Sequence, residues 1–120
     1  MSALVMVVED TLDSQILAKK ILQNAGYNAI ITGDAKSTLD MCSQVTPDII
    51  MMDISLPDMS GKDLAKKLRK IDKLKEIPII ATTAHAFIEE EEAIYKNGMN
   101  GFLSKPFSPS QLIKKIKKYI

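Results

Sequence analysis

The fold of this 120-residue chain is decided by the stretch LVMVVED, residues 4–10, in which five apolar residues end in two acids. A second stretch, IIMMD at residues 49–53, repeats the arrangement with one acid. Unbroken apolar runs of this length, each followed by a helical pattern, are typical of parallel strands covered on both faces. In such sheets ligands bind outside the carboxyl ends of the strands. We therefore expect Glu9, Asp10 and Asp53 to converge on one site.

Strand-like and helix-like segments alternate five times along the chain, as expected of a series of βα units. The expected strands cover residues 4–8, 27–31, 48–52, 78–82 and 101–104, and the expected helices cover about residues 13–25, 35–45, 62–71, 86–97 and 109–120. Gly26 and Gly98 mark helix ends, and Asp34 is expected to cap the second helix. Ser108 and Gln111 form a capping-box pattern at the start of the last helix.

Five βα units are too few for an eight-fold barrel, so they predict an α/β fold. We expect a doubly wound, five-stranded parallel sheet with helices on both faces. Right-handed crossovers then require the strand order to reverse near the first strand. In the flavodoxin-like order 2-1-3-4-5, the reversal lies between the strands that end in Glu9 and Asp10 and the strand that ends in Asp53. The three acids would then lie at the switch point, where a ligand is expected.

Composition narrows the class of protein. With 16 basic and 15 acidic residues the net charge is +1, which argues against a bulk nucleic-acid or membrane binder. No apolar run approaches the ~20 residues of a membrane span. The single cysteine, Cys42, excludes an internal disulfide and is expected to be a buried structural thiol rather than a reactive one. These features indicate a cytoplasmic domain with no direct contact to nucleic acid or membrane.

The chemistry of the clustered residues points to phosphoryl transfer. Neighbouring carboxylates repel one another, and an all-oxygen site favours a hard cation such as Mg²⁺. Lys105 adds a second positive charge and Thr83 a hydroxyl donor, which together suit the oxygens of a phosphoryl group. Asp53 can then act as the nucleophile and form an aspartyl phosphate. One such residue alone is more often a turn residue or helix cap, but coincidence at four strand ends is improbable.

Five motifs in the chain support a family resemblance. They are VED at 8–10, PDIIMMD at 47–53, LPDMSG at 56–61, PIIATTA at 78–84 and KPF at 105–107. Together they resemble the receiver domain of two-component response regulators, of the single-domain chemotaxis or phosphorelay type. The resemblance implies one receiver domain over residues 1–120. It also implies a signalling phosphoacceptor, rather than an enzyme acting on other molecules, that catalyses its own Mg²⁺-dependent phosphorylation and dephosphorylation.

The resemblance also assigns roles to residues. A histidine kinase or histidine phosphotransfer protein would donate the phosphoryl group to Asp53, and a downstream target protein would receive the signal. Thr83 and Lys105 would hold the phosphoryl oxygens, and the Lys105–Pro106 peptide bond would be cis. The Mg²⁺ ligands would be Glu9, Asp10, Asp53 and the main-chain carbonyl of Ser55.

Some positions differ from the commonest family pattern or vary within it. Glu9 stands where aspartate is more frequent, and its longer side chain can reach a cation directly or through water. Thr83 and Phe102 are the expected switch pair, and Phe102 lacks the hydroxyl of the tyrosine often found there. Ser55 and His85 occupy positions that tune the phosphate lifetime in this family, although for His85 a solvated loop residue is an equally good interpretation.

The output surface is expected on the fourth helix, the fifth strand and the fifth helix. The fourth helix carries an acidic run, Glu89–Glu92, and the fifth carries four lysines, namely Lys114, Lys115, Lys117 and Lys118. Opposite charges on two helices suit a reciprocal two-fold homodimer, although solvated faces are the simpler interpretation.

Other functions fit the sequence less well. A flavin carrier needs a phosphate-binding first loop, whereas residues 9–13 are acidic. An aspartate-based phosphatase would usually place a second acid at position 55, which is serine. The main alternative is a receiver-fold adaptor that binds its partner without phosphorylation. The presence of all five expected site residues argues against it: Glu9, Asp10, Asp53, Thr83 and Lys105. A stand-alone regulator and a receiver excised from a larger protein would have the same sequence pattern.

Overall fold

The chain forms an α/β structure around one five-stranded parallel sheet. The computed structural model describes residues 3–84 and 88–120. The strands are β1 (Leu4–Val8), β2 (Asn28–Thr32), β3 (Ile49–Asp53), β4 (Ile79–Thr83) and β5 (Gly101–Ser104). They follow the order β2-β1-β3-β4-β5, with every pairing parallel. The predicted fold class and strand order are therefore confirmed.

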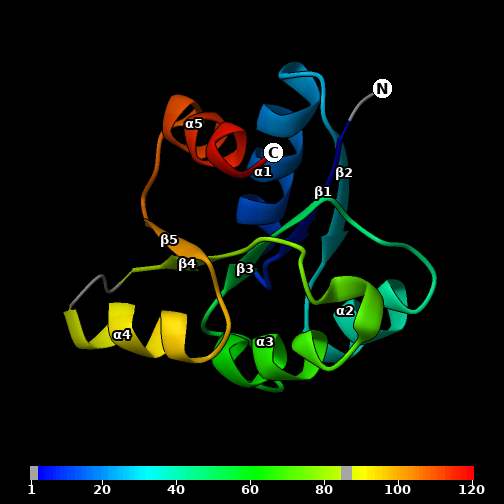
Figure 1. Cartoon of the computed structure of the whole chain (residues 1–120). Helices are drawn as coiled ribbons and strands as arrows, with labels where there is room; N and C mark the ends of the chain where they lie inside the picture. Colours follow the sequence, from blue (N-terminus) through cyan, green and yellow to red (C-terminus); the bar gives the residue numbers. More distant parts are fainter. Residues whose placement is uncertain (1–2, 85–87) are drawn as a thin grey trace.

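Helices cover both faces of the sheet. The helices are α1 (Leu12–Asn24), α2 (Ala35–Cys42), α3 (Gly61–Arg69), the short 3₁₀ helix η1 (Asp72–Leu74), α4 (Ile88–Lys96) and α5 (Pro109–Tyr119). In Figure 1, α1 and α5 lie above the sheet, and α2, α3 and α4 lie below it. This two-sided arrangement follows from right-handed crossovers on either side of the point where the strand order reverses.

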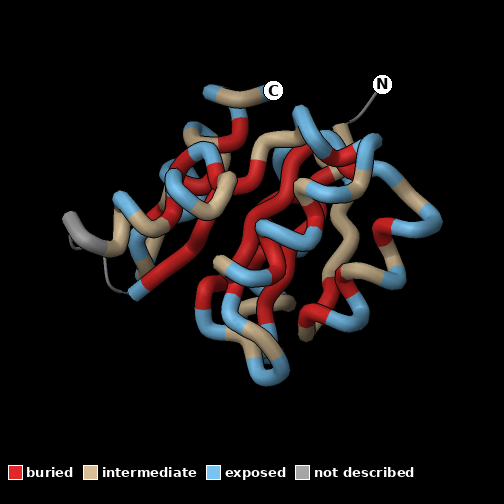
Figure 2. The backbone as a smooth tube through the Cα atoms, turned by 60° about the horizontal axis from the view of Figure 1, so that its bottom comes forward, coloured by how far each residue is buried: buried red, intermediate tan, exposed pale blue. Residues whose placement is uncertain are grey.

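The core consists of two apolar layers, one on each face of the sheet. Alternate residues of a strand point to opposite faces, so Met6 and Ile50 pack toward α2, α3 and α4, while Val5 and Ile49 pack toward α1 and α5. Figure 2 shows the result, with buried strands in the centre and exposed segments around them. All five residues of β3 and of β4 are buried, as expected for central strands covered on both faces.

The boundaries of several elements differ from those predicted. The second helix ends at Cys42 rather than near residue 45, and the third at Arg69 rather than residue 71. In both places the chain continues in tighter turns, in which Gln44 N–H donates to the Met41 carbonyl and Ile71 N–H to the Leu68 carbonyl. Apolar spacing alone does not distinguish such turns from a continuing helix.

The predicted helix caps and the glycines that follow two helices are confirmed. Asp34 accepts a hydrogen bond from Ser37 N–H at 2.7 Å, and Ser108 and Gln111 form a reciprocal capping box. Gly26 and Gly98 follow α1 and α4 with φ of 89° and 90°, a region that glycine adopts without a Cβ clash.

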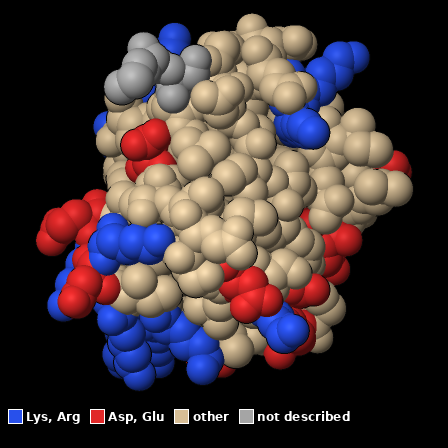
Figure 3. All heavy atoms as spheres, turned by 90° about the vertical axis from the view of Figure 1, so that its right-hand side faces the viewer, with Lys and Arg blue, Asp and Glu red and all other residues tan. Residues whose placement is uncertain are grey.

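Cys42 is fully buried, as expected of a structural thiol. Burial raises the pKa of this thiol, which keeps it protonated and unreactive, while the charge of Lys73 lowers the pKa in part. Among the described residues, none of the helices combines the length and apolar character needed to cross a bilayer. On the face drawn in Figure 3, acidic and basic side chains lie next to each other along the lower part, in keeping with a net charge of +1.

Two expected features fall outside the part of the chain that the structure describes. These are the position of His85 and the start of the fourth helix at residues 86–87. The helix is described from Ile88, and its side chains from residue 90 onward. The predictions for these positions stay predictions.

Candidate functional site

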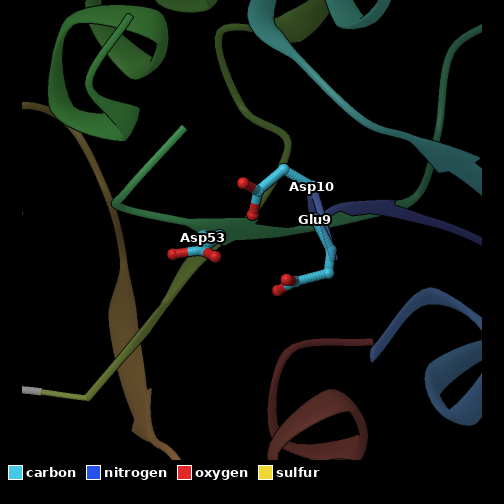
Figure 4. Close-up of side chains that lie close together, drawn as sticks. All are labelled: Glu9, Asp10 and Asp53. Atoms are coloured by element: carbon cyan, nitrogen blue, oxygen red, sulfur yellow. The ribbon is translucent and has the colours of Figure 1, made fainter. Parts of the chain in front are cut away.

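The three acids predicted from the strand ends do converge. Glu9 and Asp10 follow β1, and Asp53 is the last residue of β3, the strand paired with β1. One carboxylate oxygen of each lies within 4.8 Å of the others. Figure 4 shows Glu9 and Asp10 leaving β1 in different directions, with Asp53 beside them. Glu9 and Asp53 are buried, whereas Asp10 is exposed.

Asp53 is held at both of its carboxylate oxygens. Oδ1 accepts a hydrogen bond from Ser55 N–H at 2.9 Å, and Oδ2 lies 3.1 Å from Lys105 Nζ. The residue is only 8% exposed, and these two donors fix the direction of its carboxylate. The Asp53 side chain is therefore ordered, with a donor at each carboxylate oxygen.

Lys105 provides the positive charge of the cluster. Its Nζ lies 2.6 Å from Glu9 Oε2 in addition to its contact with Asp53. Burial lowers the pKa of this lysine, but the hydrogen bonds and charges of Glu9 and Asp53 outweigh that effect and hold the pKa above its usual value. Lys105 is therefore a fixed cation at neutral pH. Three carboxylates beside one ammonium leave excess negative charge, which an added cation can neutralise.

Both carboxylate oxygens of Glu9 already have partners. Its Oε2 bonds to Lys105, and its Oε1 accepts a hydrogen bond from Thr11 N–H at 3.2 Å. Within the described part of the chain, the Asp10 carboxylate has no hydrogen-bond or ion-pair partner. Asp10 is therefore the acid best placed to bind a ligand directly, and Glu9 mainly orders the lysine.

The strands at the other side of the site bring Thr83 and Lys105 together. Thr83 is the last residue of β4, is buried, and pairs with Ser104 in β5. Its carbonyl accepts a hydrogen bond from Lys105 N–H at 2.8 Å, which fixes the chain as it leaves β5. The next peptide bond, Lys105–Pro106, is cis as expected.

Phe102 lies in β5 two residues before Ser104, the strand partner of Thr83. It is half-buried in β5 opposite Ala81, and it packs against the core on the side of α4. Lys115 Nζ of α5 lies 6.0 Å from the centre of its ring, at the outer limit of a cation–π contact. Phe102 therefore contacts both β4 and α5.

The loop after β3 is closed tightly on itself. Ser55 pairs with Ser60 in an antiparallel bridge, and Gly61 N–H donates to the Ile54 carbonyl at 2.7 Å. A Cβ on Gly61 would lie 2.6 Å from the Asp53 carbonyl oxygen, so only glycine fits there. The loop therefore holds the main chain of Ser55 beside the acids.

A cavity of about 350 Å³ adjoins the cluster between α1 and α5. Glu9 and Lys105 are among its lining residues, and the rest of its wall is mostly apolar, including Leu17, Phe107 and Leu112. Beside it, α1 exposes three large apolar side chains, Leu12, Ile16 and Leu17. Exposed apolar residues grouped next to a charged site are typical of a protein-binding surface.

Two residues of the site region were missed by the sequence reasoning. Gln15 of α1 donates from Nε2 to the Glu9 carbonyl at 2.6 Å. Asp58 accepts from the N–H groups of Ala35 and Lys36 at 2.9 and 3.1 Å. Pro57-Asp58 does signal a turn, but neither residue has a partner that is adjacent in sequence, so no local pattern reveals the contacts.

Comparison with known proteins identifies the family. The family model of the response regulator receiver domain matches residues 5–117. The polar-differentiation response regulator DivK of Brucella anthropi is 39% identical over 116 residues, which cover 97% of this chain and 94% of that protein. The chain therefore belongs to the response regulator receiver domain family.

Solved structures agree with this assignment. The chemotaxis protein CheY4 of Vibrio cholerae superposes with a TM-score of 0.97 at 28% identity, covering 100% of both chains. The receiver domain of a Pseudomonas aeruginosa sensor histidine kinase superposes with a TM-score of 0.91 at 27% identity, covering 99% of this chain and 98% of that one, and it has a magnesium ion coordinated in its active-site cleft.

The function predicted from the sequence is confirmed at this level. The chain is a signalling phosphoacceptor domain of two-component systems, which act between histidine kinases and downstream targets. The adaptor that works without phosphorylation is not favoured.

Proposed function

We propose that Asp53 is the residue that accepts the phosphoryl group. The observation that carries the proposal is its buried carboxylate at the end of β3, held between Ser55 N–H and Lys105 Nζ. In the transfer, an Asp53 oxygen forms a bond to phosphorus while the phosphorus–nitrogen bond of a phosphohistidine breaks. The imidazole leaves with that electron pair and takes up a proton. The product is an aspartyl phosphate.

The donor set fits a Mg²⁺ ion. Asp10, Asp53 and the Ser55 carbonyl would be its protein ligands, with Glu9 close enough to take part directly or through water. All of these are oxygen donors, the ligand type that Mg²⁺ prefers, and the cluster carries excess negative charge. When bound, the ion would neutralise charge on the phosphoryl oxygens during transfer.

Thr83 and Lys105 would hold the transferred group. Lys105 lies 3.1 Å from Asp53 before transfer, so a phosphoryl group on Asp53 would form within reach of its ammonium. The Thr83 side chain comes from the neighbouring strand, where a hydroxyl can donate to a second phosphoryl oxygen. The same residues would support hydrolysis of the aspartyl phosphate, so the domain would catalyse both its phosphorylation and its dephosphorylation.

The phosphodonor is a histidine kinase or a histidine phosphotransfer protein in the cytoplasm. A phosphohistidine must approach Asp53 from the open edge of the sheet, and α1 begins at that edge. The exposed side chains Leu12, Ile16 and Leu17 are 66%, 58% and 54% exposed, so they are available to an apolar partner surface.

The output surface would be α4, β5 and α5. Phe102 connects β5 to both the core and α5, and among the described side chains of α4, from residue 90 onward, Ile94 is the buried one in the core. If phosphorylation draws Thr83 toward the phosphoryl group, Phe102 can fill the vacated space and α4 can shift. The acidic residues of α4 and the lysines of α5 would serve a target protein or a two-fold homodimer.

Intact mass spectrometry after incubation with acetyl phosphate and Mg²⁺ tests the acceptor. One phosphoryl group, stable in acid and labile in base, is expected on the parent protein and none on Asp53→Asn. Without Mg²⁺ the labelling of the parent should fall strongly. Equal labelling of Asp53→Asn would refute the assignment.

A further inference from the structure

The expected cation ligands outside the strands lie on two loops. Asp10 belongs to the loop that joins β1 to α1, and the Ser55 carbonyl belongs to the loop that joins β3 to α3. A loop can move more freely than a strand, so the affinity of the site depends on what holds each loop in place. The structure shows one side chain outside the acidic cluster that anchors each of them.

Gln15 anchors the first loop. Its Nε2 donates to the Glu9 carbonyl at 2.6 Å from the first turn of α1. That carbonyl belongs to the peptide plane that joins Glu9 to Asp10. Because a peptide plane moves as a unit, holding its oxygen also holds the Asp10 backbone. Thr32 supports the other side by accepting Glu9 N–H at 2.9 Å, so the segment before Asp10 is fixed on both sides.

Asp58 anchors the second loop. Its two carboxylate oxygens accept hydrogen bonds from Ala35 N–H and Lys36 N–H, the first residues of α2. These donors lie at a helix N-terminus, where the helix dipole also favours a carboxylate. The contact spans 23 residues of sequence, so it connects the loop to a separate part of the fold.

The position of α2 explains why this contact bears on the cation site. α2 follows β2, and β2 pairs with β1, whose end carries Asp10. The bridge between Ser55 and Ser60 sets the shape of the loop after β3, but it contacts only that loop. Asp58 therefore sets the position of the loop relative to the side of the sheet where Asp10 lies.

We propose that Gln15 and Asp58 are positioning residues that set the cation affinity of the site, each by holding the main chain of one ligand-bearing loop. The inference rests on the proposed function, because it takes Asp10 and the Ser55 carbonyl as ligands. Residues that support metal ligands typically change affinity by 10–100-fold when they are replaced. Gln15 is half-buried and Asp58 is exposed, so an effect of about tenfold, near the lower limit, is expected for each.

Mg²⁺ titrations followed by amide NMR shifts, without a phosphodonor, provide the first test. Gln15→Met keeps the length of the side chain but removes the donor, and Asp58→Ala removes both acceptors. Asp58→Asn removes the charge but keeps one acceptor oxygen. Gln23→Met and Asp40→Ala are matched controls, because both residues are exposed and lie on α1 and α2 without a side-chain contact among the described residues.

The expected result is a rise in Kd for Mg²⁺ of about tenfold for Gln15→Met and Asp58→Ala, a smaller rise for Asp58→Asn, and no change for the controls. In acetyl phosphate labelling, the Mg²⁺ concentration for half-maximal rate should rise by the same factor, while the rate at saturating Mg²⁺ stays within twofold of the parent. A general loss of structure would instead lower the thermal midpoint in EDTA and the maximal rate.

The proposal is overturned for Gln15 if Gln15→Met binds Mg²⁺ as tightly as the parent. It is overturned for Asp58 if Asp58→Asn and Asp58→Ala weaken binding equally, since the charge alone would then account for the effect. Asp10→Ala separates this failure from that of the proposed function. If Asp10→Ala still binds Mg²⁺ as the parent does, the cation site itself is misassigned; if only Asp10→Ala loses binding, the site stands and the positioning role is wrong.

Discussion

An ordered cation lies at each end of the sheet, and the partners of the two cations, Lys105 and Arg69, differ. At the carboxyl end, Lys105 bonds to the carboxylates of Glu9 and Asp53. At the amino end, Arg69 of α3 bonds to neutral oxygens. Its guanidinium donates to the carbonyls of Leu74, Lys75, Ile77 and Gly98 and to the side chain of Asn100, at distances from 2.7 to 3.2 Å.

The difference shows which end of the sheet can change its contacts. The ammonium of Lys105 has charged partners, so a phosphoryl group arriving at Asp53 can replace one negative partner with another. If Arg69 moved, several main-chain carbonyls would lose this donor at once, which costs free energy for each acceptor left unpaired. The carboxyl end is therefore suited to switching, and the amino end to holding η1 and the start of β4 and β5 in place.

The largest expected effect is the loss of signal transmission in Lys105→Ala. This variant keeps Asp53, Asp10 and the Ser55 carbonyl, so it should still bind Mg²⁺ and accept phosphate from acetyl phosphate. Without the ammonium, the phosphoryl group has no link from Asp53 to β5. Amide shifts in α4, β5 and α5 on phosphorylation should therefore be absent, whereas the parent shows them. A labelled Lys105→Ala protein with parental shifts would contradict this role.

Next in size is the destabilisation of Arg69→Met. The substitution keeps the apolar part of the side chain but leaves its acceptors without a donor. Hydrogen bonds to a charged group contribute about 1.5–3 kcal/mol each and are not additive, so a loss of about 3 kcal/mol in the free energy of unfolding is expected. Urea unfolding measures it. Lys70→Met is the control, because Lys70 is exposed and its replacement should cost less than about 0.5 kcal/mol. Equal stability of the two variants would remove the distinction between the ends of the sheet.

The two ends of the sheet also differ in how far the sequence predicts them. The apolar runs and the acids that end them gave the strands, their order and the convergence of Glu9, Asp10 and Asp53, because strand ends of a parallel sheet meet at one edge. Arg69, Gln15 and Asp58 were not predicted. Their partners are mainly main-chain atoms outside their own helix or loop, and main-chain atoms carry no residue-specific signal. Turns such as η1 were missed because they continue the apolar spacing of the helix before them.

A third prediction concerns α4. A hydrogen bond to a main-chain carbonyl fixes the chain beyond its C-terminal end, and an ion pair holds it near its N-terminal end. Beyond its C-terminal end, the Gly98 carbonyl accepts from Arg69 at 2.9 Å, and near its N-terminal end Glu90 pairs with Lys62 of α3 at 3.3 Å. The second contact is a partly exposed ion pair, worth about 0–1 kcal/mol. Amide shifts on phosphorylation should spread from Asp53 over residues 84–107 and be larger at residues 90–92 than at residues 97–99. Changes confined to the neighbours of Asp53 would exclude this surface as the switch, and uniform shifts along α4 would exclude a pivot at Arg69.

The smallest expected effect is a pH dependence that comes from Asp58. The hydrogen bond from Ala35 N–H, followed by that from Lys36, holds the pKa of this carboxyl below its usual value, although desolvation raises it in part. A carboxyl whose pKa is lower in the folded state stabilises the fold above its unfolded pKa, near 3.9, and loses that contribution as the pH falls through the folded value. The difference in thermal midpoint between the parent and Asp58→Ala should therefore be constant above about pH 5 and shrink below about pH 4. Differential scanning calorimetry from pH 7 to pH 3 measures it, with Asp40→Ala, an exposed aspartate of α2, as the matched variant. A difference that stays constant over the whole range would mean that the α2 N-terminus does not hold the ionised form of Asp58, and the loop after β3 would then lack the anchor inferred for it.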